Sequence, residues 1–171
     1  WVAGFLQKGV ITGSPTLSYE IGDGSNYRPV SVAFNSVSSG GNLTASVSQS
    51  AGAHPNLATS AINNTLRLDR YYTLTNSGTA FTSYDATFNF IAADVINGAD
   101  PNNFIAAKWD GAVWTYPTVG TKTSTSTQIT GVTSFSDFAF GENNATPALS
   151  ASTLGSFGSV CINTTAGPNT F

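Results

Sequence analysis

The residues that could do chemistry are few: the 171-residue chain has one histidine, one cysteine, nine acidic and six basic side chains. His54, in the segment AGAHPN, is the one side chain suited to be the general base of a Ser/His/Asp triad. No GxSxG segment supplies a nucleophile for it, so we expect a histidine of a surface loop. A single histidine and a single cysteine also fall short of the nitrogen and sulfur ligands of a usual zinc site.

Cys161 lies in an apolar segment between Val160 and Ile162. A reactive cysteine needs a basic neighbourhood that lowers its pKa, and no basic residue is close in the sequence. We therefore expect a buried structural thiol. A single cysteine also rules out a disulfide within the chain.

The positions of the acidic residues favour a structural role for them over a catalytic one. A glycoside hydrolase would need two carboxylates that face each other across a cleft, whereas several aspartates lie in or beside predicted strands. Opposite charges on neighbouring strands pair readily. We predict structural ion pairs in which Arg67 or Arg70 meets Asp85 or Asp137.

Three other aspartates occupy loops rich in asparagine and glycine: Asp23, Asp94 and Asp100. Carboxylate and carbonyl oxygens are the ligands that calcium prefers. The sequence has no EF-hand and no glycine-aspartate repeat, so loop calcium is the one cofactor that we retain as a candidate.

Aromatic residues are a second candidate site, because exposed rings on a β-sandwich can stack on sugars. Aromatic rings also form the ordinary core of such a fold. Alternation within strands assigns four of them to the core: Phe88, Phe90, Phe104 and Trp109. Three others are the better candidates for exposed ligand contacts: Trp114, Tyr116 and Tyr72.

The elements that must position these residues are short strands. Apolar and polar residues alternate along residues 17–21, 30–34, 43–47 and 84–90, with Gly- and Ser-rich turns between such runs. Roughly nine or ten strands of this kind, without a 3.6-residue periodicity, predict an all-β antiparallel β-sandwich, Ig-like or jelly-roll-like. A closed barrel is the alternative.

Two local features are predicted in more detail. Residues 57–62 favour one short helical turn. Asp110-Gly111 predicts a tight hairpin turn in which both central residues have positive φ, with Val113 and Trp114 opening the return strand.

The predicted domain boundary lies near residue 143, where the strand-rich part of the sequence gives way to the segment NNATP. We predict a β-sandwich domain over 1–142, a linker over 143–147 and C-terminal strands over 148–171. That extended tail is too short to bury a core of its own. It is either the start of a second Ig-like module or a strand donated to another subunit.

Composition narrows the function classes further. Charged residues make up 9% of the chain, and the net charge is −3, against about 25% charged in an average soluble domain. The six cations are scattered, so we expect no nucleic-acid partner and no attraction to anionic membranes.

No apolar run approaches the ~20 residues of a transmembrane helix, so we expect no membrane insertion. The chain lacks methionine and a basic start with a long apolar region, so we expect a segment of a longer, secreted precursor.

Four segments carry a resemblance to a known family. They are, in order, IGDGSNYRPVSVAF, RYYTLTNSG, YDATFNF, and NFIAAKWDGAVWTYP followed by ITGVTSFSDFAFGE. Their order and spacing resemble a repeat module of large secreted, adhesin-like surface proteins of Bacteroidota and related bacteria, proteins associated with type IX secretion. The resemblance covers residues 2–142, and the tail from Pro147 resembles the start of an Ig-like module. It implies an extracellular β-sandwich that is one unit in a string and has no catalytic residue.

These observations predict a non-enzymatic structural or adhesive module of a bacterial cell-surface protein or extracellular fibre. Its partners would be neighbouring copies or modules of the same protein, joined by β-strand addition. The expected assembly residues lie near the two chain ends: Val2, Phe5, Leu6, Phe157, Val160, Ile162 and Phe171. The alternative is a carbohydrate-binding module that contacts surface glycans through exposed aromatic residues.

Overall fold

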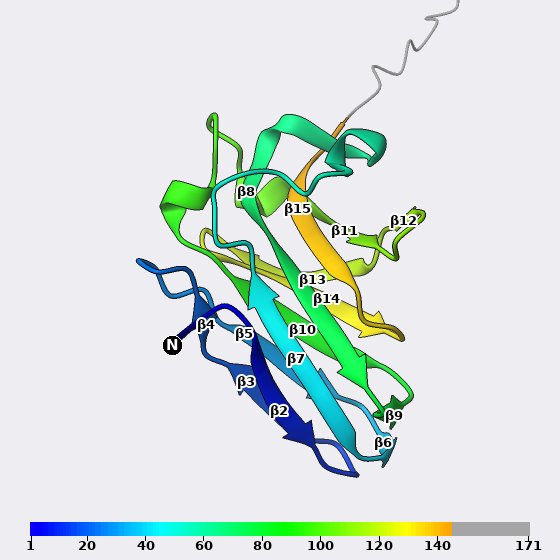
Figure 1. Ribbon diagram of the computed structural model, residues 1–171. Helices are drawn as coiled ribbons and strands as arrows, with labels where there is room; N and C mark the ends of the chain where they lie inside the picture. Colours follow the sequence, from blue (N-terminus) through cyan, green and yellow to red (C-terminus); the bar gives the residue numbers. More distant parts are fainter. Residues whose placement is uncertain (145–171) are drawn as a thin grey trace, which may run out of the picture.

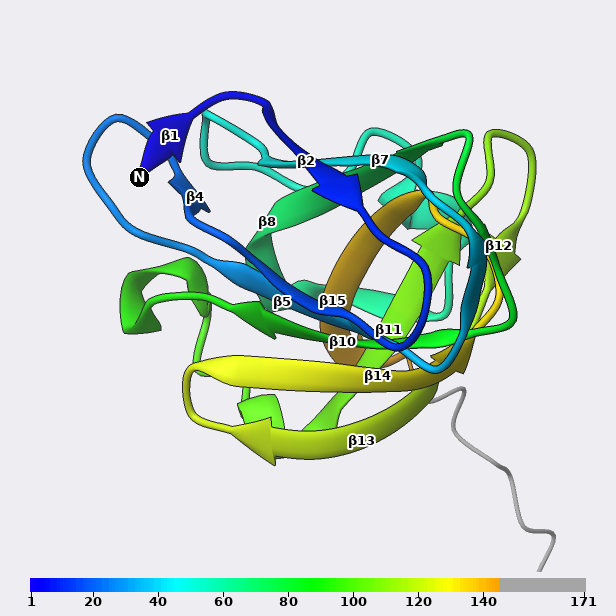
Figure 2. The same ribbon diagram turned by 90° about the horizontal axis from the view of Figure 1, so that it is seen from below.

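The computed structural model describes residues 1–144, which fold into two antiparallel sheets packed face to face (Figure 1, Figure 2). The five-stranded sheet has the order β13 (Thr118–Thr123), β14 (Ser126–Val132), β10 (Tyr84–Asn89), β5 (Val30–Phe34) and β3 (Thr16–Tyr19). The six-stranded sheet has the order β12 (Trp114–Thr115), β11 (Phe104–Trp109), β15 (Asp137–Asn143), β8 (Ile62–Ser77), β7 (Gly41–Val47) and β2 (Leu6–Val10). The predicted all-β sandwich is confirmed, and both sheets end in edge strands, unlike the sheet of a closed barrel.

Shorter elements complete the described part of the chain. β1 (Val2–Ala3) pairs in parallel with β4 (Ile21–Gly22), and β6 (Val37–Ser39) pairs antiparallel with β9 (Ala80–Phe81). The 3₁₀ turns are η1 (Leu57–Thr59), η2 (Ala92–Asp94) and η3 (Pro101–Asn103). The predicted helical turn is confirmed as η1.

The core lies between the sheets, where alternate side chains of each strand point inward. The predicted inward rows of β5, β7 and β10 are buried: Val30, Val32, Phe34, Leu43, Ala45, Val47, Tyr84, Ala86 and Phe88. The ring of Phe88 lies at the centre, with centroids 5.1 Å from Tyr72, 5.1 Å from Phe138 and 5.0 Å from Phe140. Edge-to-face and tilted contacts of this kind hold the two sheets together.

The segment between β7 and β8, residues 48–61, crosses the outer face of the six-stranded sheet. Leu57 of η1 packs there against Ile62, Ala107 and Ala139 in a small second cluster outside the sandwich. Because of this cover, β11 and β15 bury residues on both of their faces.

The hairpin between β11 and β12 differs from the prediction. Trp109 pairs with Trp114, so the connection has four residues, and of these Gly111 alone has a positive φ, 103°. The Asp110 carboxylate closes the turn by accepting the amide N–H of Ala112 at 2.9 Å and of Val113 at 2.8 Å. This side-chain turn needs no second left-handed residue, and it leaves Val113 exposed outside the return strand.

The end of the described chain still belongs to the sandwich. Asn143 pairs with Ile62, and the amide N–H of Asn144 donates to the carbonyl oxygen of Ala61 at 2.6 Å. The expected linker therefore begins inside β15. The expected C-terminal strands, with Cys161, Phe157, Val160, Ile162 and Phe171, lie outside the described residues. Among the residues described, no helix has the length and apolar character needed to cross a bilayer.

Candidate functional site

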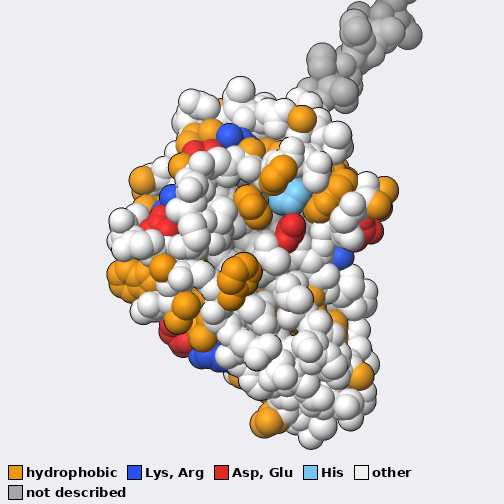
Figure 3. All heavy atoms as spheres, in the orientation of Figure 1, with side chains coloured by type: hydrophobic (Ala, Val, Ile, Leu, Met, Phe, Trp, Pro, Cys, Tyr) orange, Lys and Arg blue, Asp and Glu red, His pale blue; other side chains and the backbone are white. Residues whose placement is uncertain are grey.

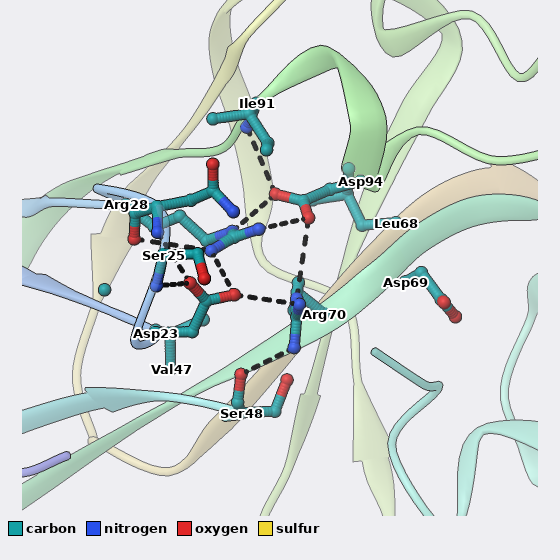
Figure 4. A network of polar contacts seen from close by, with 12 residues as sticks. Asp23, Ser25, Arg28, Val47, Ser48, Leu68, Asp69, Arg70, Ile91 and Asp94 are labelled. Atoms are coloured by element: carbon teal, nitrogen blue, oxygen red, sulfur yellow. Dashed lines mark hydrogen bonds and ion pairs between the residues drawn. The ribbon is translucent and has the colours of Figure 1, made fainter. Parts of the chain in front are cut away.

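Four buried charges meet at one end of the sandwich (Figure 4). Arg28, just before β5, donates from Nε to Asp94 Oδ2 at 2.6 Å and from Nη2 to Asp94 Oδ1 at 2.7 Å. Its Nη1 lies 2.7 Å from Asp23 Oδ2, which also accepts from Arg70 Nη2 at 2.9 Å. Arg70 lies on β8, so this charge network ties the β4–β5 loop and η2 to the six-stranded sheet.

The network is closed by backbone groups. Asp23 Oδ1 accepts the amide N–H of Ser25 and of Asn26, at 2.8 and 2.7 Å, and Arg70 donates to the carbonyl oxygen of Ser48 at 3.1 Å. Burial pushes the pKa of Asp23 up, but these amides and Arg28 outweigh it and hold the pKa below its ordinary value. Hydrogen bonds to Asp94 raise the pKa of Arg28, whose side chain is 1% exposed. Two buried cations thus neutralise two buried anions.

The calcium prediction is wrong for Asp23 and Asp94, because two guanidinium groups already occupy the oxygens that a cation would need. Asp100 has a different role: its Oδ1 accepts the amide N–H of Asn102 at 2.9 Å and so begins η3. Within residues 1–144, no group of three or more metal-ligating side chains is present.

The predicted cross-strand ion pairs are also wrong. Arg67 pairs with Asp69 on its own strand, at 2.6 Å, and Arg70 points inward to the charge network. Asp85 accepts the amide N–H of Gly131 at 2.8 Å. Asp137 meets His54 instead of an arginine.

His54 is buried, contrary to the expected surface position, with 5% of the residue exposed. The 48–61 segment lays it on the outer face of the six-stranded sheet. Its Nδ1 accepts the amide N–H of Asn56 at 3.2 Å, and its Nε2 lies 3.1 Å from Asp137 Oδ2. Because Nδ1 acts as an acceptor, the proton of the neutral ring belongs on Nε2, which donates to Asp137.

This His54–Asp137 pair has the wrong geometry for a catalytic triad. Thr73 Oγ1 donates to Asp137 Oδ1 at 2.6 Å, so the hydroxyl bonds to the carboxylate and not to the imidazole. Both ring nitrogens of His54 are already engaged. A general base must have a free nitrogen within reach of its nucleophile, so the pair serves to pin the 48–61 segment to β8 and β15.

Three aromatic rings surround His54. Tyr71 and Trp114 lie edge-on to the imidazole, each with a centroid distance of 5.0 Å, and Trp109 lies at 6.1 Å. Figure 3 shows this face, with the single histidine in pale blue among orange hydrophobic side chains. A hollow of about 470 Å³ opens beside the cluster, and its lining includes Trp109, Asp137, Thr73 and Asn76. We call it the outer-face hollow.

The three predicted ligand-contact residues do not form one platform. Tyr72 is fully buried in the core, where its hydroxyl donates to the carbonyl oxygen of Asn89, so this prediction is wrong. Trp114 is half-buried, and its Nε1 donates to the carbonyl oxygen of Asn56 and to Thr59 Oγ1, both at 3.1 Å. Tyr116 is exposed, although its hydroxyl accepts the amide N–H of Ala61 at 2.7 Å. The Trp109 ring, predicted to lie in the core, instead borders the outer-face hollow.

Comparison with models of protein families, with curated proteins and with solved structures finds no match to this chain. The geometry of the described residues therefore carries the functional argument alone.

Proposed function

We propose that this chain is a non-enzymatic structural or adhesive module of a bacterial cell-surface protein or extracellular fibre, and that it joins neighbouring copies or modules at strand β2. The observation that carries the proposal is the surface around β2. This strand is an edge of the six-stranded sheet and pairs with β7 alone. An edge strand presents unpaired N–H and C=O groups, which are a template for adding a strand.

Exposed apolar side chains border this edge. Phe5, one residue before β2, is 77% exposed, and Ile11, one residue after it, is 72% exposed. Trp1 and Val2 are exposed as well, so four of the seven large hydrophobic residues exposed in the described chain lie within its first eleven positions. Backbone groups for pairing and apolar side chains for burial thus occur together at β2.

Lysine at an edge strand commonly blocks pairing. Lys8, the one charged residue of β2, instead reaches toward the other sheet. Its Nζ donates to the carbonyl oxygen of Ser18 at 2.6 Å and to Glu20 Oε2 at 2.7 Å. The lysine charge therefore has a partner within the module, and it closes the side of the sandwich between β2 and β3.

The positions of the ionisable groups support a role without catalysis. The charge network is buried between loops and strands, and His54 and Asp137 pin the 48–61 segment. On the five-stranded sheet the outward positions carry mainly small polar side chains, for example Ser31, Thr87 and Thr130.

We expect Phe5→Glu to weaken self-association by at least about tenfold, because burial of one phenylalanine contributes about 1.5–3 kcal/mol and each 1.4 kcal/mol is tenfold. The measurement is light scattering after size exclusion over a concentration series of the full chain. The matched control is Val113→Glu, which places the same charge on an exposed apolar residue at the opposite edge of the sheet and should leave association unchanged.

A wild-type chain that stays monomeric at every concentration would contradict the proposal, as would equal effects of the two substitutions. Deleting residues 148–171 then identifies the donor. Loss of association on deletion assigns the donated strand to the C-terminal tail, whereas unchanged association assigns it to the β2 edge of a second copy.

A second candidate function is glycan binding, favoured by the outer-face hollow. A half-buried tryptophan ring, Trp109, stands there beside hydroxyl, amide and carboxylate groups, a combination that suits a sugar ring. Trp109→Ala should abolish binding on an array of plant, algal and bacterial glycans, and Trp109→Phe should retain part of it. An array on which the wild-type chain binds nothing would remove this candidate.

A further inference from the structure

Lys108 is a buried cation that has no carboxylate partner within the described part of the chain. It lies on β11, on the same inward face as Phe104 and Ala106, and 6% of the residue is exposed. Among residues 1–144, no carboxylate oxygen lies within 4.0 Å of its Nζ, whereas Arg28 and Arg70 each have two acidic partners. The residue is largely buried while its Nζ keeps contact with solvent, and a partly desolvated ammonium group with no carboxylate beside it favours the arrival of an anion.

The side chain lines a hollow of about 510 Å³ between the β11–β12 hairpin and β14, which we call the lysine hollow. Five hydroxyl residues contribute to its wall: Thr115, Thr118, Thr130, Thr133 and Ser134. The ring of Tyr116, 48% exposed, contributes an aromatic face. A cation, several hydroxyls and one accessible ring therefore surround the same space.

Asp110 is the one carboxylate among the residues that line this hollow. Its oxygen is engaged by the amides of Ala112 and Val113, which lower its pKa and keep it ionised. Burial lowers the pKa of Lys108, and the charge of Asp110 pushes it partly back up. Since Asp110 is exposed at the turn, its charge is screened by water, and it does not replace a bound counter-ion at Nζ.

We propose that the lysine hollow binds a uronic acid residue of an acidic polysaccharide. The carboxylate of the sugar would sit on Lys108 Nζ, its hydroxyl groups would bond to the threonine and serine side chains, and its C–H face would stack on Tyr116. A neutral sugar lacks the group that pairs with the buried cation, and a simple carboxylate lacks the groups that use the hydroxyl wall. The volume lies in the range of small-molecule sites, about 300–1,000 Å³.

This site is separate from the outer-face hollow, although Asp110 borders both. It is also independent of strand addition, because β2 and β11 lie at different positions of the six-stranded sheet and do not pair. Failure of one proposal therefore leaves the other standing.

The test is a titration of the ¹⁵N-labelled chain with D-glucuronate, D-glucose and acetate, followed by amide chemical shifts. We expect glucuronate to shift the amides of Thr130, Gly131 and Ser134 and to bind at least tenfold more tightly than either control compound. Lys108→Met, which keeps an unbranched apolar stem, should weaken glucuronate binding at least tenfold, and Lys122→Met on β13 should not. Raising the pH through the lowered pKa of Lys108 should weaken glucuronate binding and leave glucose unaffected.

Equal affinities for glucuronate and acetate would overturn the assignment to a sugar, and equal affinities for glucuronate and glucose would overturn the role of the cation. Glucuronate shifts confined to other parts of the sandwich would overturn the site itself. The comparison among the three compounds uses the wild-type chain, so it decides the question even if Lys108→Met fails to fold.

Discussion

Replacing Arg28 with methionine is expected to lower the free energy of unfolding by about 3–5 kcal/mol, the usual cost of removing one member of a buried ion pair. The substitution takes three short contacts from Asp94 and Asp23, at 2.6, 2.7 and 2.7 Å. It leaves two buried carboxylates with a single guanidinium group, that of Arg70. Urea-induced unfolding followed by tryptophan fluorescence measures the loss.

The matched control is Lys8→Met, which removes a cation from an ion pair of similar length, 2.7 Å, whose side chains are 32% and 47% exposed. Pairs that face water contribute little, so this variant should lose only a small part of what Arg28→Met loses. Similar losses in the two variants would show that the charge network does not hold the loops to the sheets.

Replacing Phe88 with alanine is expected to cost about 3–5 kcal/mol, because it leaves a cavity in the middle of the core. Phe88 is fully buried and contacts Tyr72, Phe138 and Phe140 from the opposite sheet. The same denaturation experiment measures the effect.

Phe5→Ala is the control for this prediction, since it removes the same side chain from a site that is 77% exposed. In the monomer it should change the free energy of unfolding by less than about 0.5 kcal/mol. Comparable destabilisation by the two substitutions would mean that the core is not centred on Phe88.

The sequence predicts the sheets well because burial repeats with the period of a strand. In β5, β7 and β10 every second residue is apolar, and those residues fill the core. On β8 burial still alternates over residues 68–74, but the buried residues are not all apolar. The inward face carries Leu68, Arg70, Tyr72 and Leu74. The arginine interrupts the apolar row, and for this reason the sequence predicts Tyr72 to be exposed although it is buried.

Trp109 shows the opposite error. The sequence prediction places both Phe104 and Trp109 in the core, but residues an odd number of positions apart on one strand face opposite sides of the sheet. The inward row of β11 is Phe104, Ala106 and Lys108. A lysine in the core is improbable from sequence alone. Lys108 borders the hydroxyl-lined hollow, and the sequence alone does not show that this hollow exists.

The charged contacts were unpredictable for a different reason, which is sequence distance. Arg28 and Asp94 are separated by 66 positions, and His54 and Asp137 by 83. No local pattern joins such residues, and the choice of partner depends on how the two sheets stack. The turn at Asp23 is visible in the sequence, but its two arginine partners are not: Arg28 lies later in the same loop, just before β5, and Arg70 lies on β8.

Amide hydrogen exchange of residues 6–10, compared between dilute and concentrated samples of the full chain, tests the proposed assembly at β2 most directly. A strand added to the open edge would pair the free N–H groups of β2. We predict that exchange of these amides slows at least tenfold with increasing concentration, while that of β13, the edge of the other sheet, stays constant. Exchange in β2 that is independent of concentration would contradict the account.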